Sequence, residues 1–324
     1  MNPRLNPKLY TKKVELAAAR SGVGQGLVEA GKRDKNIVVL CADLAESTKT
    51  HLFAEKFPER FIECGVAEQN MMSLAAGLAR EGKIPFVASY AVFSPGRNWD
   101  QLRTNVCYNN VPVKIVGSHA GISVGADGAT HQALEDIALC RVLPNLIVLI
   151  PCDALEAKKA CLAAAKVKMP VYLRLTRPKT PIITTPRSPF KIGKAQILNP
   201  GKDATVCASG PLVYDSLMVA KKLKSESISV EVINNHTIKP LDKKTIISSV
   251  KKTGCLVTVE EHQIAGGAGS AVLEMLAENF PIPAERVGMP DAFGESGEPR
   301  ELLEKYGLCC SGIERAIKKV LKRK

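Results

Sequence analysis

The chain has 324 residues, of which 45% are hydrophobic and 24% are charged. This length and apolar content suit two packed domains and exclude an intrinsically disordered chain. Forty-five Lys and Arg against 32 Asp and Glu give a net charge of +13, which favours anionic partners. The lysines are mostly dispersed surface pairs and only 5% of residues are aromatic, so we expect no nucleic-acid partner and a largely solvated basic surface.

The apolar runs are too short for a signal peptide or a membrane span. The longest, 37–42 and 146–150, fall far below the roughly 20 residues that cross a bilayer. We therefore expect a cytoplasmic protein with no membrane partner. The ten cysteines lie in core-like segments without CxxC spacing, and Cys309 and Cys310 are adjacent, so we expect reduced thiols and no metal site on this chain.

Residues 14–176 alternate helical periods with short β-rich runs, which is typical of a mostly parallel sheet covered by helices. In chain order, the expected helices of this part are 14–32, 67–81, 99–108, 131–141 and 154–166. The expected strands are 37–43, 84–90, 111–118, 146–153 and 170–176. This pattern predicts the α/β class.

A proline-rich stretch separates this part from the rest of the chain. Four prolines fall within residues 178–189, and each removes a backbone donor and restrains the preceding residue. We expect a linker at 179–191 between a first domain at 1–178 and a second at 192–324. The second domain has expected strands at 204–209, 229–235 and 256–260, and helices at 214–224 and up to residue 278. Each domain should contain a mostly parallel sheet flanked by helices.

Polar residues gather where the expected strands of the first domain end, which is where parallel sheets display ligands. They occur in residues 43–47, 90–97 and 117–131 and at Arg177. The loop 117–131 holds four glycines, two histidines and an aspartate, more than a connector needs, although Asp-Gly is also a common turn. The chain has no strand-linked GxGxxG and no GxxxxGK[ST], which argues against dinucleotide-binding and P-loop proteins.

Glu68 begins an expected helix whose later residues are nearly all small or apolar. A partly buried carboxyl group at this place can exchange a proton with a ligand. The alternative is structural: an acid in the first turn of a helix is stabilised by the helix dipole. Composition alone favours the structural interpretation.

Five segments, in order, resemble the pyrimidine-binding and C-terminal domains of transketolases. They are GVAEQNMMSLAAGLA, PFVASYAVFSPGRNWDQLR, GSHAGISVGADGATHQALEDIALCRVLPN, LTRP and VEEHQIAGGAGS. The resemblance covers nearly the whole chain, and several unrelated segments agree in order and spacing. It implies a thiamine diphosphate enzyme that transfers a two-carbon ketol unit between sugar phosphates.

The resemblance assigns the cofactor contacts. Glu68 would contact the aminopyrimidine and activate it by sharing a proton, which replaces the structural interpretation of this residue. Tyr90 and Phe93 would pack on the pyrimidine ring, with Trp99 a weaker candidate and a core role for Phe93 left open. Asp43 would lie near the thiazolium.

The resemblance also assigns the substrate contacts. Basic and hydroxyl groups would hold the phosphate, while other polar groups would meet the sugar hydroxyls. The residues expected to hold the phosphate are Arg20, Ser47, His131 and Arg177. The residues expected to meet the sugar hydroxyls are His119 and Asp127. His119 and His131 are also candidates for catalysis.

The sequence contains no GDG motif, which in full-length relatives binds the metal and the diphosphate. The resemblance therefore implies an N-terminal transketolase subunit as partner, which would hold Mg²⁺ or Ca²⁺ in a heterotetramer where this chain also self-associates. The chain alone would be inactive. The alternatives are a deoxyxylulose phosphate synthase-like subunit, a 2-oxo acid dehydrogenase β-like subunit and a non-catalytic relative. The GSHAGISVGADGATHQ stretch favours transketolase over the first two.

Overall fold

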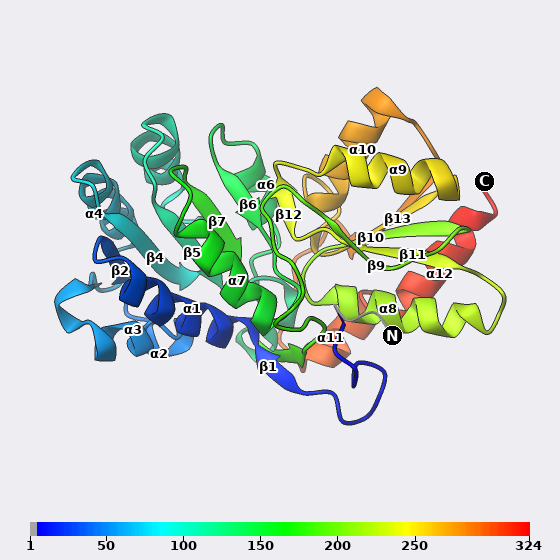
Figure 1. Cartoon of the computed structure of the whole chain (residues 1–324), viewed down its shortest axis with the longest axis horizontal. Coiled ribbons are helices and arrows are strands. Elements are labelled where there is room, and N and C mark those ends of the chain that lie inside the picture. Colours follow the sequence, from blue (N-terminus) through cyan, green and yellow to red (C-terminus); the bar gives the residue numbers. More distant parts are fainter. Residues whose placement is uncertain (1–4) are drawn as a thin grey trace.

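The computed structural model describes residues 5–324, so the first four residues of the expected first domain lie outside it. Two α/β units lie side by side in Figure 1. One is built on a seven-stranded sheet and the other on a five-stranded sheet, while β1 and β8 form a separate two-stranded sheet. The predicted fold class, two α/β domains with mostly parallel sheets, is confirmed.

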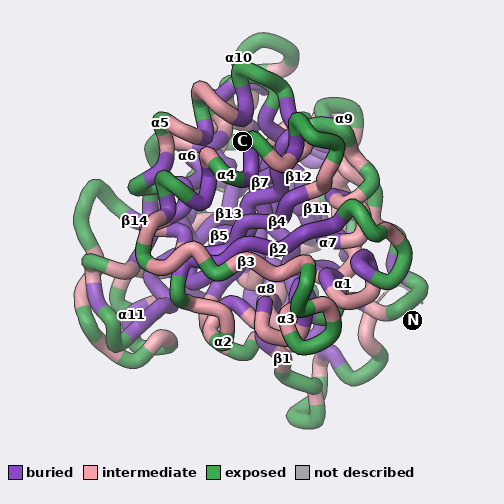
Figure 2. The backbone as a smooth tube through the Cα atoms, turned by 90° about the vertical axis from the view of Figure 1, so that its left-hand side faces the viewer, coloured by how far each residue is buried: buried purple, intermediate pink, exposed green. Residues whose placement is uncertain are grey.

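The seven-stranded sheet is parallel except at one edge. Its order is β12-β6-β7-β5-β4-β2-β3, and β12, from the second half of the chain, runs antiparallel to β6. Figure 2 shows β2 and β5 buried along their length and β3 partly exposed at the edge, as expected for a sheet covered on both faces. The strands are β2 (Ile37–Cys41), β3 (Phe61–Glu63), β4 (Ile84–Tyr90), β5 (Lys114–Ser118), β6 (Ile147–Leu149), β7 (Val171–Arg174) and β12 (Thr237–Lys239).

Helices cover both faces of this sheet. Apolar residues of α1 and α7 fill the core on one face, and those of α4, η2 and α6 fill the core on the other. The helices are α1 (Ala19–Arg33), α2 (Ala45–Thr48), α3 (His51–Lys56), η1 (Pro58–Arg60), α4 (Glu68–Arg80), α5 (Trp99–Gln101), the π-helix η2 (Leu102–Tyr108), the 3-10 helix η3 (Ile122–Asp127), α6 (Asp136–Arg141) and α7 (Ala154–Ala164).

Two expected helices begin later than predicted, because tertiary pairing outweighs local propensity. The expected helix 14–32 starts only at Ala19, since β1 (Leu16–Ala18) pairs antiparallel with β8 (Lys179–Pro181). Strand β8 lies inside the proline-rich stretch, where no strand was predicted. The expected helix 131–141 starts only at Asp136, and Ala133 instead forms a β-bridge with Ala120.

The five-stranded sheet has the order β14-β13-β10-β11-β9, with β9 antiparallel at one edge. Helices α9 and α10 lie on one side of this sheet in Figure 1, and α8 and α12 on the other. The strands are β9 (Gln196–Asn199), β10 (Ala204–Ala208), β11 (Val230–Asn234), β13 (Leu256–Gln263) and β14 (Ala284–Met289). The helices are α8 (Leu212–Lys224), α9 (Lys243–Thr253), α10 (Ala268–Asn279), α11 (Pro299–Lys305) and α12 (Cys310–Leu321).

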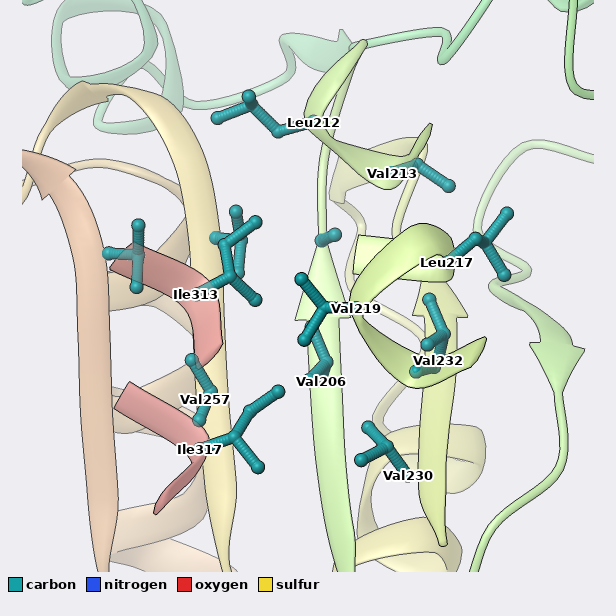
Figure 3. Close-up of a cluster of buried hydrophobic side chains, with 14 of the residues drawn as sticks. Val206, Leu212, Val213, Leu217, Val219, Val230, Val232, Val257, Ile313 and Ile317 are labelled. Carbon is teal, nitrogen blue, oxygen red and sulfur yellow. The ribbon is translucent and has the colours of Figure 1, made fainter. Parts of the chain in front are cut away.

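The core of the second unit consists of two hydrophobic clusters, one on each face of its sheet, and the larger one is mainly aliphatic. Figure 3 shows side chains of α8 and α12 against valines of β10, β11 and β13. The sequence patterns predicted β10, β11, β13, α8 and α10, but not β9, β12, β14, α9, α11 or α12. Within residues 5–324 all ten cysteines are free, and none of the helices has the length and apolar character needed to cross a membrane.

Candidate active site

The carboxyl edge of the seven-stranded sheet carries the chemistry-bearing side chains. Because β2, β4, β5 and β7 are parallel, the loops that follow them meet at one edge. The structure brings most of the expected site residues into one cluster there. Its members are Arg20, Tyr90, Phe93, His119, Asp127, His131 and Arg177.

His119 lies at the centre of this cluster. Its Nε2 is 3.1 Å from Nη1 of Arg20, and its Nδ1 is 2.8 Å from the hydroxyl of Ser118. The ring of Tyr90 stacks on the imidazole with 3.9 Å between centroids. Because arginine can only donate, Nε2 is the acceptor and Nδ1 carries the proton that it donates to Ser118. Burial, followed by the charge of Arg20, lowers the pKa of His119 to about 3, so this histidine is neutral near pH 7.

Two arginines make the cluster positive. Nη1 of Arg177 donates to the carbonyl of Val124 at 2.7 Å and lies 3.5 Å from the carboxylate of Asp127. Burial, and next the charge of Arg177, lowers the pKa of Arg20, which remains a cation because arginine titrates far above neutral pH. The buried Nε of Arg20 has no hydrogen-bond partner in the described part of the chain. A buried guanidinium N–H without a partner, with a second arginine close enough to act on its charge, suits an anionic ligand.

Aromatic rings form a wall beside these cations. Tyr90 and Phe93 stack with 5.9 Å between centroids. His131 lies edge-on to Phe93 at 5.5 Å, and its Nδ1 is 2.9 Å from the hydroxyl of Thr130. The core clusters do not include Phe93, so its half-buried ring faces the site rather than the interior.

Glu68 is the first residue of α4, and its side chain is only 4% exposed. Its carboxylate accepts from Nη1 of Arg97 at 3.3 and 3.4 Å, and the Arg97 guanidinium lies 4.1 Å from the centre of the Phe93 ring. Asn98 fastens the same turn by donating its amide to the Glu68 carbonyl at 3.1 Å. Sequence reasoning singled out the segment 90–97 but gave no role to Arg97, a basic residue four positions after Phe93.

The other expected cofactor and substrate residues lie apart from this network. Trp99 donates its indole N–H to the Leu139 carbonyl at 2.9 Å and packs against the core, which is a structural position. Asp43 and Ser47 follow β2 at the same edge, but within residues 5–324 neither side chain makes a hydrogen bond or ion pair. The backbone N–H of Asp43 donates to Glu63 at 2.7 Å.

The second unit holds the loop 117–131 in place. The carboxylate of Glu261 at the end of β13 accepts from the backbone N–H of Ser123 at 2.6 Å, across the domain boundary. The Gln132 amide donates to the Glu295 carbonyl at 2.8 Å. Gly121 has a φ of 87°, and a Cβ there would collide with the Glu261 carboxylate. Sequence reasoning singled out this glycine-rich loop but gave no role to Gln132 or Glu261, although VEEHQ already stood out as a segment.

Family comparisons agree with this geometry. The transketolase pyrimidine-binding domain matches residues 16–182, and the transketolase C-terminal domain matches residues 193–313. These two matches define a protein of the transketolase type. The chain belongs to the transketolase family, and the resemblance drawn from the five segments is confirmed.

Individual relatives show that this chain matches the C-terminal section of transketolases. A Methanocaldococcus jannaschii protein described as a transketolase C-terminal section is 45% identical over 307 residues, 94% of this chain and 96% of that protein. A 6-deoxy-6-sulfo-D-fructose transketolase subunit of Clostridium sp. is 41% identical over 298 residues, 92% of each chain. A solved split-gene transketolase, described as an inactive β4 tetramer, superposes with a TM-score of 0.89 and 46% identity, covering 94% of this chain and 98% of that one. The chain is thus of the split-transketolase C-terminal type.

Proposed function

We propose that this chain is the C-terminal subunit of a split transketolase, which with an N-terminal partner subunit transfers a two-carbon ketol unit between sugar phosphates. The observation that carries the proposal is the cluster of Arg20, neutral His119 and Arg177 beside the aromatic wall. A heterotetramer of both subunits, in which copies of this chain also associate, would complete the site. The β4 tetramer described for the similar split-gene transketolase supports this self-association.

The residues at the sheet edge fit one end of thiamine diphosphate. A buried carboxylate at Glu68 suits a ring nitrogen, and the rings of Tyr90 and Phe93 suit the face of a flat heterocycle. When bound, this cofactor supplies the nucleophilic carbon of ketol transfer. Glu68 would hold a proton against the aminopyrimidine in a site shielded from water, and Asp43 would face the second ring.

We assign the metal ion, Mg²⁺ or Ca²⁺, to the partner subunit together with the diphosphate. Residues 5–324 contain no group of three or more His, Cys, Asp or Glu side chains placed to hold a metal. The cofactor site would therefore lie at a subunit boundary, with this chain supplying the pyrimidine side.

Arg20 and Arg177 would bind the anionic end of the substrate, together with Ser47 and His131. Neutral His119 and the carboxylate of Asp127 would meet the sugar hydroxyls. The relative whose name refers to a sulfosugar suggests that the anionic end is a phosphate or a sulfonate, and a guanidinium pair suits both.

Glu68→Gln tests the proposed role of the carboxylate. The chain is mixed with its N-terminal subunit, thiamine diphosphate and Mg²⁺, and assayed with xylulose 5-phosphate and ribose 5-phosphate. We expect kcat to fall by about 100-fold or more, because the amide cannot share the proton. Glu81→Gln, at the exposed far end of the same helix, is the matched control and should be active. Near-normal turnover of Glu68→Gln would refute this role.

Arg177→Ala tests recognition of the anionic group. We expect KM for ribose 5-phosphate to rise about tenfold or more, with little change for an acceptor that lacks the phosphate. Arg187→Ala, an exposed arginine in the proline-rich stretch, should change neither value. Equal losses with both acceptors would argue against phosphate recognition by Arg177.

A further inference from the structure

The turn Ser94–Asn98, here called the SPGRN turn, is fixed by backbone hydrogen bonds, while the side chain of Arg97 is half-exposed. The N–H of Ser94 donates to the Tyr90 carbonyl at 2.8 Å, and the N–H of Arg97 donates to the Phe93 carbonyl at 2.9 Å. The Asn98 amide joins the turn to α4 through the carbonyl of Glu68. By contrast, the side chain of Arg97 is 51% exposed. The guanidinium is thus the part of the turn that can move.

Arg97 makes two contacts at once. Its Nη1 lies 3.3 Å from one carboxylate oxygen of Glu68 and 3.4 Å from the other. Its guanidinium lies 4.1 Å from the centre of the Phe93 ring. Within residues 5–324, Arg97 is the only side chain that bonds to the Glu68 carboxylate. A flat cation suits both a carboxylate and the face of an aromatic ring.

The two contacts coincide with those that the proposed function, on which this inference rests, assigns to the aminopyrimidine. That ring would also bond to Glu68 and pack on Phe93. We propose that Arg97 is a positioning residue that occupies both contacts in the free chain and must leave them when the cofactor binds. A buried carboxylate left without a partner is costly, so Arg97 stabilises the empty site until the aminopyrimidine replaces it.

This replacement has a measurable consequence for affinity. Breaking the Arg97 contacts opposes cofactor binding, so a variant that never makes them should bind the cofactor more tightly. Arg97→Met keeps most of the side-chain length and removes the charge. From the usual strengths of a half-exposed ion pair and a cation–π contact, we expect about a five- to tenfold lower Kd.

Calorimetric titration of thiamine diphosphate and Mg²⁺ into the complex with the N-terminal subunit tests the inference. Arg97→Met should bind more tightly than the unmodified chain, and Arg97→Lys, which keeps the charge but not the flat group, should fall between them. The control is Arg103→Met, an exposed arginine on η2, which should leave the Kd unchanged. An equal or weaker affinity of Arg97→Met would overturn the inference.

A double variant separates this role from a merely structural one. When Glu68 is already Gln, its ion pair with Arg97 no longer exists, so adding Arg97→Met should lower the Kd by much less than in the unmodified chain. An equal gain in both backgrounds would show that Arg97 acts independently of Glu68. If the complex with the unmodified chain binds no thiamine diphosphate at all, the proposed function itself fails, which is a different outcome from normal binding without an Arg97 effect.

Discussion

The loop 117–131 and the SPGRN turn lie at the same edge of one sheet but are held in different ways. Glu261 and the Gln132 bond to the 294–299 segment fix the loop against the second unit. The SPGRN turn is fixed through its backbone, and Arg97 reaches Glu68 through a half-exposed ion pair. The difference indicates that the side proposed for the sugar is already built in the single chain, while the side proposed for the cofactor is arranged to change.

Replacing Gly121 in the loop 117–131 should test this comparison most sharply, with Gly65, which precedes α4 and lies outside both regions, as the control. Gly121 and Gly65 both have positive φ, 87° and 67°. A Cβ at Gly121 would meet the buried Glu261 carboxylate, whereas a Cβ at Gly65 would have no atom within 4 Å. We expect Gly121→Ala to lower the free energy of unfolding by about 3 kcal/mol or more, and Gly65→Ala by about 1 kcal/mol, as measured by denaturant unfolding. Equal losses would contradict the tight contact between the loop and Glu261.

Truncating Glu261 should loosen the loop 117–131 and lower the free energy of unfolding by less than Gly121→Ala does. Burial raises the pKa of Glu261, and its bond to the Ser123 N–H is lost in Glu261→Ala. We expect a loss of about 2–3 kcal/mol in the free energy of unfolding and a higher KM for the sugar phosphate.

The affinity of the Glu261→Ala complex for thiamine diphosphate should change little, because the SPGRN turn does not depend on this contact. Glu278→Ala, an exposed acid at the end of α10, should stay within about 0.5 kcal/mol of the unmodified chain. A parallel loss of cofactor affinity in Glu261→Ala would mean that the two regions are coupled.

Near neutral pH the smallest expected effect is that of His119, because its contribution to stability changes only below about pH 6.5. Its folded-state pKa of about 3 lies below the ordinary value of 6.5, so the unfolded chain binds the proton first. The contribution of this group to the free energy of unfolding therefore falls as the pH drops from 6.5 toward 3, by up to about 1.4 kcal/mol per pH unit.

His119→Asn should flatten this part of the stability curve, and ring NMR signals of His119 should show no titration between pH 5 and 8. An inflection in that range would show that the site is more open to water than the loop contacts indicate. It would weaken the contrast between the fixed loop and the open SPGRN turn.

Sequence patterns predicted the regular parts of the fold well and its edges poorly. Central strands such as Ile37–Cys41 are continuous apolar runs, because both faces of the sheet are covered. The edge strands β9, β12 and β14 lack such a run, since they are short or contain polar and exposed residues. The start of α1 was misplaced because residues 16–18 pair with β8, a strand more than 150 residues further along the chain.

For the candidate site, the resemblance predicted residues that the structure places together, including His119, Tyr90 and Arg20. The roles of these residues toward cofactor and substrate are predictions, as are those of Asp43 and Ser47. The positioning residues Arg97 and Glu261 were missed because neither has a local pattern that distinguishes it from a surface charge. Only their partners, Glu68 and Ser123, reveal what they do.

The sequence by itself determined the α/β class, the family and the sheet edge at which polar residues collect, because hydrophobic periodicity and ordered motifs are local properties of the chain. Tertiary structure alone decided that the second unit holds the glycine loop and that Glu68 is paired with Arg97. Those outcomes depend on which groups meet across long sequence separations, and burial then sets the strength of each contact.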